Sequence, residues 1–477
     1  MSLTQSAERA ALNKLIDYLD DNPQENIDKI MDLVNKLVPD RVFPVQREAF
    51  TNVIKSRGNW YDLIMRIFSL NPKMRTKLLK ALIVDGNLLA WPQQEKNREK
   101  YQCNIPWAIL LDPTSACNLH CTGCWAAEYG YKQNLSFDDI DSIVTQGKEL
   151  GTHIYIYTGG EPLVRKHDLI RICEKHQDCV FLCFTNSTLI DEAFCDDMIR
   201  VANFVPAISA EGNERTTDAR RGKGTYEKIE HAMKLLRERN LPFGISTCWT
   251  SANVDTVATE ENMDWMIREG ALFCWYFYFM PVGRSATSEL MPTPEQREHM
   301  YRFIREMREK KPLFTLDFQN DGEFVGGCIA GGRRYLHINA AGDVEPCVFI
   351  HYSNANIHDV CLLDALRSPL FMKYYEGQPF NDNYLKPCPM LENPDVLPKM
   401  VAEAGAMSTD LVEKESPEQL REKTRAAAKA WSSVAELIWN DPKDPLYTKR
   451  HDDMTQGMAD SDMHKFKKQG RKLKSNC

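Results

Sequence analysis

Three cysteines stand close together in the sequence, in the order Cys117-Asn-Leu-His-Cys121-Thr-Gly-Cys124. They follow a short apolar segment through Asp112-Pro113-Thr114. Thiolates at positions i, i+4 and i+7 can converge on one metal centre if the chain wraps around it. Three cysteines without a well-spaced fourth favour an iron–sulfur cluster that keeps one iron open.

Two other interpretations of this segment are weaker. The same spacing would place the cysteines along one face of a helix, but Pro113 and Gly123 bracket the segment and disfavour a helix. A zinc knuckle would use the cysteines together with His120, because both residue types bind zinc. The segment also follows a predicted strand, and ligands of α/β folds bind at the carboxyl ends of strands.

Further segments with glycines and charged residues follow in order along the chain. Thr158-Gly159-Gly160-Glu161-Pro162 ends a predicted strand, and a glycine pair there lets the backbone approach a ligand closely. Beyond it stand Thr185-Asn186-Ser187, Ser209-Ala-Glu211-Gly212 and Arg221-Gly-Lys-Gly224-Thr-Tyr226. Together with the CxxxCxxC spacing, this series resembles the radical S-adenosylmethionine (SAM) superfamily from about Trp107 to Arg284.

The resemblance implies a role for each of these segments. Cys117, Cys121 and Cys124 would hold three irons of a [4Fe–4S] cluster, and SAM would chelate the fourth. Arg221 would approach the SAM carboxylate, which a guanidinium fork can bind with two hydrogen bonds. The expected contacts to SAM are Gly159, Gly160, Glu161, Pro162, Thr185, Asn186, Ser209, Glu211 and Arg221.

The resemblance also implies a reaction. SAM would be cleaved reductively to methionine and a 5′-deoxyadenosyl radical, which abstracts hydrogen from an unreactive C–H bond. The electron would come from a reductant such as ferredoxin or flavodoxin. The sequence identifies no catalytic acid, base or radical partner. The competing interpretation is a non-catalytic iron–sulfur protein that transfers electrons, but such a protein has no use for a SAM carboxylate site.

Two positions depart from the family pattern. Many members carry an aromatic residue just before the third cysteine, against the adenine of SAM. This chain has Gly123 there, and Trp125 follows the motif. Glu211 replaces the usual aspartate of the SxDG element.

The C-terminal part resembles the SPASM/twitch extension, which adds auxiliary clusters to radical SAM enzymes. A full SPASM domain uses seven cysteines for two clusters, whereas the chain beyond Arg284 has Cys328, Cys347, Cys361, Cys388 and Cys477. We therefore expect one auxiliary [4Fe–4S] cluster, held by Cys328, Cys347 and Cys388. Its fourth ligand would be absent, a non-cysteine group or Cys361. The alternative is three buried structural thiols.

The elements that position these residues follow a regular pattern. Six predicted strands alternate with helices, namely Trp107–Leu111, His153–Tyr157, Val180–Phe184, Phe204–Ser209, Phe243–Thr247 and Phe273–Phe279. This alternation predicts a parallel sheet with right-handed crossovers. Six units are two fewer than a closed (β/α)8 barrel needs. We therefore expect an α/β core built as a partial (β/α)6 barrel or as an open doubly wound sheet.

The chain divides into four predicted regions. Residues 1–100 are helical only, residues 101–312 form the radical SAM core, and residues 313–405 form a hairpin-plus-helices cluster domain. Residues 406–477 are a helical extension that ends in a basic tail. Within the first region, residues 73–91 set Lys and Arg beside a broad apolar stripe. This stripe most simply packs on the core, and the alternative is a surface that admits a lipid or contacts a membrane.

Composition narrows the class of protein. The 477 residues are 43% hydrophobic and 26% charged with a net charge of −8, which gives no reason to expect nucleic acid as a partner. We find no signal peptide and no apolar run long enough to span a membrane, so the cytoplasm is the expected location. Fifteen cysteines without secretory features favour metal binding over disulfides.

The sequence leaves the substrate open between a peptide or protein and a lipid-like molecule. Many SPASM/twitch enzymes modify peptides, and those often carry an N-terminal winged helix with a strand hairpin. Residues 1–100 show no strand pattern, which weakens that interpretation. A helical region with an apolar and basic stripe is compatible with a long apolar substrate.

Overall fold

The computed structural model describes residues 3–37, 44–126, 133–283, 286–410 and 414–447. One sheet of nine strands forms the centre of this part of the chain, in the order β7-β6-β5-β4-β3-β2-β1-β8-β9. Its strands pair in parallel, except that β9 runs antiparallel to β8. The strands are β1 (Ala108–Leu111), β2 (Ile154–Tyr157), β3 (Val180–Thr185), β4 (Phe204–Ser209), β5 (Gly244–Trp249), β6 (Phe273–Tyr278), β7 (Phe314–Asp317), β8 (Tyr335–Ile338) and β9 (Val344–Glu345).

The strand order decides between the two expected architectures. From β1 to β7, neighbours in the sheet are also neighbours in the sequence, without the central reversal that defines a doubly wound sheet. The parallel partial barrel is therefore confirmed, and the six predicted strands are β1 to β6. β7, a strand of four residues, was not predicted.

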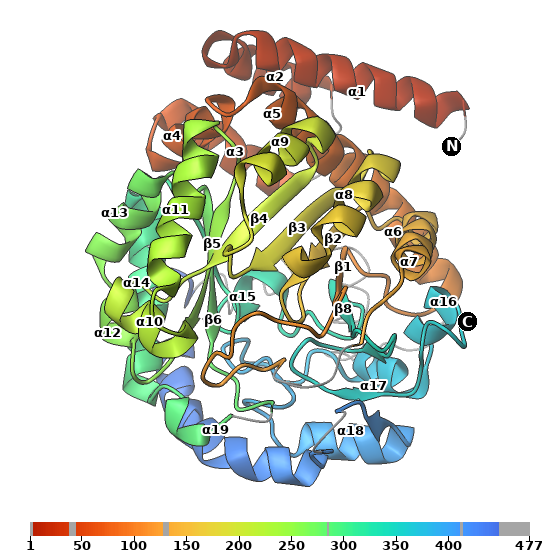
Figure 1. Ribbon diagram of the computed structural model, residues 1–477, viewed down its shortest axis with the longest axis vertical. Helices are drawn as coiled ribbons and strands as arrows, with labels where there is room; N and C mark the ends of the chain where they lie inside the picture. The colour runs from red at the N-terminus through yellow and green to blue at the C-terminus, as the bar shows by residue number, and fades with distance from the viewer. Residues whose placement is uncertain (1–2, 38–43, 127–132, 284–285, 411–413, 448–477) are drawn as a thin grey trace.

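Helices cover the outer face of this sheet (Figure 1). They begin and end where the sequence carries capping residues and apolar residues at helical spacing. In α7, for example, Ser136 and Asp139 form a capping box, and Ile140, Ile143 and Val144 are buried. The other helices of this layer are α8 (Lys166–Lys175), α9 (Glu192–Val201), α10 (Glu214–Arg221), α11 (Thr225–Glu238), α12 (Val254–Val257), α13 (Glu260–Glu269) and α14 (Pro294–Lys310); α7 spans Phe137–Leu150.

The predicted C-terminal hairpin is continuous with the core sheet. Its first strand, β8, pairs in parallel with β1, with Ala108 opposite Tyr335 and Leu111 opposite Ile338. The hairpin therefore extends the barrel past β1. The elements that follow are β10 (Tyr352–Ser353), α16 (Leu362–Leu366), α17 (Pro369–Gly377), α18 (Val396–Ala404), β11 (Met407–Ser408) and α19 (Pro417–Trp439), with the short α15 (Gly322–Val325) before the hairpin.

The N-terminal region is helical throughout its described residues, as expected. It comprises α1 (Leu3–Asp21), α2 (Pro23–Leu37), α3 (Pro44–Ser56), α4 (Asn59–Phe68), α5 (Pro72–Leu79), the π-helix η1 (Lys80–Leu89) and α6 (Ala90–Tyr101). These helices lie across the end of the barrel where the strands begin (Figure 1). Arg66, for instance, donates to the carbonyls of Ala271 and Pro312, which precede β6 and β7.

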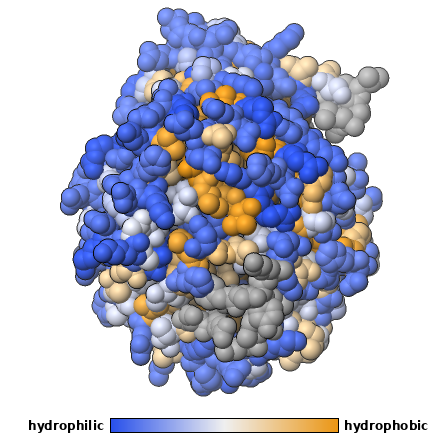
Figure 2. Space-filling model, viewed as in Figure 1, coloured by the Kyte–Doolittle hydropathy of each residue, from blue (hydrophilic) through white to orange (hydrophobic). Residues whose placement is uncertain are grey.

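The apolar stripe of residues 73–91 packs on the barrel. Met74, Ala81, Val84 and Ala90 are buried, whereas Leu82, Ile83 and Leu88 stay partly exposed. Within the described residues, no helix combines the length and apolar character that crossing a membrane requires. The face shown in Figure 2 is mostly hydrophilic, with hydrophobic residues gathered near its centre. The basic tail and Cys477 lie outside the described residues.

Candidate cofactor and substrate site

A cavity of about 230 Å³ lies inside the barrel and reaches the carboxyl ends of its strands. It brings together residues from segments far apart in the sequence. Most of the residues that we selected from the sequence line it, namely Cys117, Cys121, Cys124, Gly159, Gly160, Glu161, Thr185, Asn186, Ser209 and Arg221. Pro162 and Glu211 lie outside this lining.

The loop that carries the three cysteines is tied to two neighbouring elements. Asn186, just after β3, donates to the side chain of Asn118 at 2.8 Å. The N–H of Thr122 donates to the carbonyl of Arg220 at the end of α10 (2.9 Å). Arg221 reaches toward the thiol of Cys121, with its Nη1 4.0 Å from Sγ. These contacts hold the cysteine loop against β3 and α10.

The three thiols fit a cluster better than a single zinc ion. A tetrahedral zinc site with Zn–S bonds of about 2.3 Å would bring its sulfurs to about 3.8 Å of one another. In the described part of the chain, His153, Asp178 and Cys179 are the only group of three possible ligands whose ligand atoms all lie within 4.8 Å of one another. The thiols of Cys117, Cys121 and Cys124 are therefore spaced more widely than a single zinc ion requires. His120, the other zinc ligand considered, is exposed. Burial raises the pKa of Cys117 to about 12, so thiolate formation there would accompany metal binding.

The glycine pair allows the loop after β2 to pack against the cysteine loop. Gly159 has a φ of +99°, and a Cβ there would lie 2.8 Å from the carbonyl oxygen of Thr114. A Cβ on Gly160 would lie 2.2 Å from the carbonyl oxygen of Ala116. The Gly160 N–H donates to the Thr114 carbonyl at 3.0 Å. Both glycines are therefore required by chain packing, in addition to any approach of a ligand.

Glu161 joins the ends of β2 and β3. Its buried carboxylate accepts hydrogen bonds from the Thr185 hydroxyl and the Asn186 N–H, both at 2.7 Å. It also accepts from the Leu163 N–H at 3.0 Å. Burial raises the pKa of this carboxyl, and these donors oppose the shift. The Glu161 carboxylate therefore organises the rim of the cavity.

Glu211 stands behind two arginines rather than in the cavity wall. Its fully buried carboxylate receives two hydrogen bonds from Arg221, both at 2.6 Å, and one from Arg220 at 2.9 Å. Both arginines line the cavity. Arg220 was not selected from the sequence, although its position beside Arg221 was the available signal. The pair places two guanidinium groups beside the cysteine loop.

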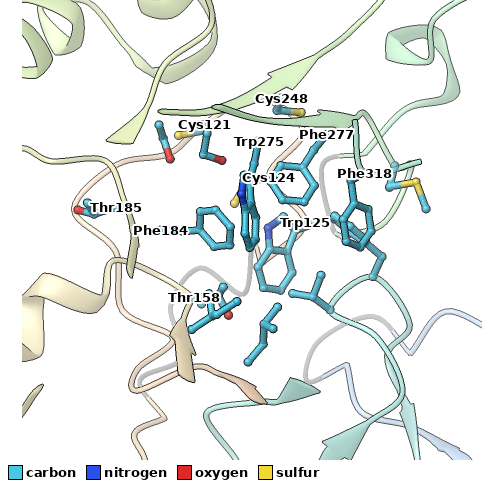
Figure 3. A pocket seen from close by; sticks show the side chains of 18 of the residues that line it. Cys121, Cys124, Trp125, Thr158, Phe184, Thr185, Cys248, Trp275, Phe277 and Phe318 are labelled. Atoms are coloured by element: carbon cyan, nitrogen blue, oxygen red, sulfur yellow. The ribbon is translucent and has the colours of Figure 1, made fainter. Parts of the chain in front are cut away.

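The other half of the cavity is aromatic. Figure 3 shows Trp125, Phe184, Trp275, Phe277 and Phe318 gathered around Cys124. Their rings pack against one another, with centroids 5.2 Å apart for Phe184 and Trp275 and 5.2 Å apart for Phe277 and Phe318. The lining continues to Trp107 and Arg334, at the starts of β1 and β8. The cavity therefore runs from the cysteine loop into the interior of the barrel.

Phe279 occupies the space beside the glycine that replaces the expected aromatic residue. Gly123 has a φ of +64°, and a Cβ there would lie 2.5 Å from the Phe279 ring. Phe279 follows β6 and also lines the cavity. An aromatic ring thus stands next to the third cysteine, supplied by a distant segment. The sequence offered no signal that the Phe279 ring would lie beside Gly123.

The three C-terminal cysteines also come together. Cys328, Cys347 and Cys388 follow α15, β9 and α17, respectively. Burial raises the pKa of the Cys388 thiol, and the charges of Glu392, Cys328 and Cys347 act in the same direction. Cys361 differs, because it is exposed at the N-terminus of α16 and its thiol donates to Asp364.

Comparison with known proteins identifies the class. Residues 111–264 match the family model described as the radical SAM superfamily. The chain is 24% identical to an AdoMet-dependent heme synthase of Methanosarcina barkeri, over 54% of this chain and 80% of that protein. It is 29% identical to a PqqA peptide cyclase of Bradyrhizobium diazoefficiens, over 53% and 70% of the two chains. Among solved structures, SuiB of Streptococcus suis with bound S-adenosylmethionine has a TM-score of 0.48 at 17% identity, covering 57% and 68%.

The chain therefore carries a radical SAM domain, as its sequence predicted. The cofactors of such a domain are a [4Fe–4S] cluster and SAM, and the donor set of three thiols beside an arginine-lined cavity fits both.

Proposed function

We propose that this protein cleaves SAM reductively and removes a hydrogen atom from a lipid-like, apolar substrate held in the aromatic half of the cavity. The observation that carries the proposal is the division of one cavity into two parts. One part holds the cysteine loop and two arginines, and the other is walled by aromatic rings. SAM bound at the cluster supplies a 5′-deoxyadenosyl radical on one-electron reduction.

The residues at the polar end would bind and orient SAM. Arg221 keeps its Nη1 on the cavity side, where it can meet a carboxylate, while Glu211 holds its Nε and Nη2. The backbone of residues 159–161 and the side chains of Thr185, Asn186 and Ser209 complete this end. A low-potential donor such as ferredoxin or flavodoxin would provide the electron, and we expect the enzyme to work in the cytoplasm.

The aromatic end would position the substrate and exclude water. A peptide buried there would leave backbone N–H and C=O groups facing rings that cannot pair with them, which costs free energy. An alkyl or other apolar group pays no such penalty and gains from burial. This physical argument favours a lipid-like substrate over a peptide. The names of the relatives point to heme and peptide substrates, which the experiment below includes.

Cys328, Cys347 and Cys388 would hold an auxiliary [4Fe–4S] cluster. Cys347 is buried, and Cys328 and Cys388 are half-buried. Cys361 is exposed and its thiol donates to Asp364, so it is not proposed as a ligand. Glu392 is an unsuitable fourth ligand, because its carboxylate already accepts from the Cys388 N–H (2.8 Å) and pairs with Arg297 (2.8 Å).

The test is formation of 5′-deoxyadenosine by anaerobically reconstituted protein with SAM and a strong reductant. Deuterated acyl lipids, a deuterated peptide pool and a deuterated porphyrin would be supplied separately. We expect deuterium in 5′-deoxyadenosine with the lipids, and no product from Cys124→Ala. Deuterium transfer only from the peptides or only from the porphyrin would show that the lipid proposal is wrong and would identify that class as the substrate. Iron-loaded protein that forms no 5′-deoxyadenosine with any substrate would favour the electron carrier.

A matched pair of variants links this activity to the aromatic wall. Trp275→Ala removes a ring that lines the cavity, whereas Trp265→Ala removes one that stacks on Tyr226 between outer helices. Loss of substrate positioning should lower deuterium transfer by about tenfold or more in Trp275→Ala, while 5′-deoxyadenosine still forms. Trp265→Ala should transfer label as the wild type does. Equal effects in the two variants would contradict a substrate role for this cavity.

A further inference from the structure

Two buried tyrosines lie beside segments that carry the C-terminal cysteines. Tyr335 lies on β8 and Tyr374 on α17, so the two side chains approach the cysteines from separate elements. Both residues are buried. What their hydroxyls do depends on the auxiliary cluster proposed above, and the inference rests on that proposal.

Tyr335 stands between the substrate cavity and the cysteines. Its hydroxyl lies 2.8 Å from the Sγ of Cys347. Its ring lines the cavity and meets Phe318 edge-on, with centroids 6.1 Å apart. None of the three cysteines lines the cavity. Tyr335 is therefore a wall residue whose polar end points toward the cluster site.

The Tyr374 hydroxyl has no hydrogen-bond partner among the described residues, although it is buried. Its position is closely constrained, because a Cβ on Gly331 would lie 2.4 Å from the Tyr374 Cβ and Phe380 packs edge-on at 5.3 Å. One turn later on the chain, Gln378 donates to the carbonyl of Cys328 at 3.0 Å. A buried hydroxyl without a partner is unfavourable, so a native partner is expected at this point.

The backbone against which Tyr374 packs leads to the cysteines. The N–H of Gly331 donates to the carbonyl of Pro346, the residue before Cys347, at 2.8 Å. A phenol hydroxyl carries one O–H donor, so the side chains of Tyr335 and Tyr374 can each donate one hydrogen bond.

We propose that Tyr335 and Tyr374 donate hydrogen bonds to sulfur atoms of the auxiliary cluster, and that these bonds raise its reduction potential. Tyr335 donates to the Cys347 thiolate, and Tyr374 donates to a sulfur that is present only when the cluster is bound. Hydrogen bonds to cluster sulfurs stabilise the reduced state, which carries more negative charge. The two hydroxyls thus make the auxiliary cluster a better electron acceptor.

The experiment uses full-length protein with Cys117, Cys121 and Cys124 all replaced by Ala, so that the auxiliary cluster alone gives a signal. Its midpoint potential would be measured by a redox titration followed by electron paramagnetic resonance. Tyr335→Phe and Tyr374→Phe each remove one hydroxyl. Tyr276→Phe is the control, because Tyr276 is equally buried and its hydroxyl faces the sulfur of Met263, far from the proposed ligands in the sequence.

We expect lower midpoint potentials in Tyr335→Phe and Tyr374→Phe, an unchanged potential in Tyr276→Phe, and the same iron and sulfide content in all. An unchanged potential in Tyr374→Phe would overturn the inference. Loss of iron from a folded Tyr374→Phe protein would also overturn it, because Tyr374 would then be a ligand. A background protein that binds no cluster at all would instead show that the proposed auxiliary site is wrong, and the inference would fall with it.

Discussion

Glu211 shows how one residue can serve a cofactor site without facing it. Its carboxylate is buried and is shared by Arg220 and Arg221. The pKa of the Arg221 guanidinium is raised, because Glu211 outweighs the effect of burial. The family pattern suggested a SAM contact at this position, whereas the geometry makes Glu211 the group that orients two arginines. A glutamate is long enough to reach both from behind.

Replacing Glu211 by Gln should therefore weaken SAM binding. The variant loses the charge that fixes Arg221, and charge-assisted hydrogen bonds are worth about 1.5–3 kcal/mol each. We expect a rise of about tenfold or more in the Kd for SAM, measured by equilibrium dialysis with cluster-loaded protein. Glu214→Gln, an exposed change at the start of α10, should bind SAM normally. Equal affinities in the two variants would argue against this role.

At the scale of elements, the loops after β1, β2 and β3 form one interlocked unit. The loop after β2 hydrogen-bonds to the cysteine loop through Gly160 and Glu161. Glu161 then connects to the end of β3 through Thr185 and Asn186. Parallel pairing aligns the ends of these strands, since Leu111 lies opposite Tyr157 and Tyr157 opposite Cys183. The geometry of the cysteines therefore depends on the neighbouring loops.

A methyl group at Gly160 should disturb the cysteines without touching them. The added Cβ would meet the backbone of Ala116 at 2.2 Å, and the cysteine loop would have to move. We expect Gly160→Ala to lose about 1–3 kcal/mol of unfolding free energy and much of its N-terminal cluster iron. Thermal unfolding and iron analysis measure the two effects. Gly58→Ala, where the nearest atom is 3.7 Å away, is the control and should change neither.

At the scale of the whole molecule, the C-terminal part is fastened to the barrel by a buried polar network. His337 on β8 lies 2.9 Å from Asp112 at the end of β1 and 2.6 Å from Glu345 on β9. His351 pairs with Asp410 at 2.7 Å, which ties the segment after β11 to the same region. Trp125 packs edge-on against His337, so this network also borders the cofactor site.

The attachment through His351 should weaken at high pH. Burial opposes the charge on this imidazole, but the hydrogen bond to Asp410 and the charge of Glu345 prevail and raise the pKa of His351 to about 9. An unfolded histidine has a pKa of about 6.5. The stabilisation is therefore complete below about pH 6.5 and is lost as the pH rises through about 9.

Urea unfolding across this pH range measures the effect, which should be on the order of 3 kcal/mol. His351→Gln should lose this part of the pH dependence and be less stable at low pH. His358→Gln is the control, because the His358 side chain is 51% exposed and should contribute little. If His351→Gln kept the full slope of the wild type, another group would be responsible.

Much of the site could be predicted because its signals are local. The spacing of Cys117, Cys121 and Cys124, the glycine pair and the alternation of strands and helices each depend on residues close in sequence. Arg220, Phe279 and Tyr374 were missed, because their roles come from contacts with distant segments. The local sequence around a tyrosine on a short helix does not show whether that tyrosine is a core residue or a neighbour of a cluster site.

The sequence by itself determined the class of protein, the cysteine loop and the parallel core, because turn residues and hydrophobic periodicity depend only on residues that are close in sequence. Only the tertiary structure decided that the hairpin joins β1 and that Phe279 fills the place beside Gly123. It alone divided the cavity into a polar and an aromatic half, and it placed the Tyr335 hydroxyl against Cys347. These outcomes follow from side-chain packing between strands and loops that are far apart in the chain, which no local pattern records.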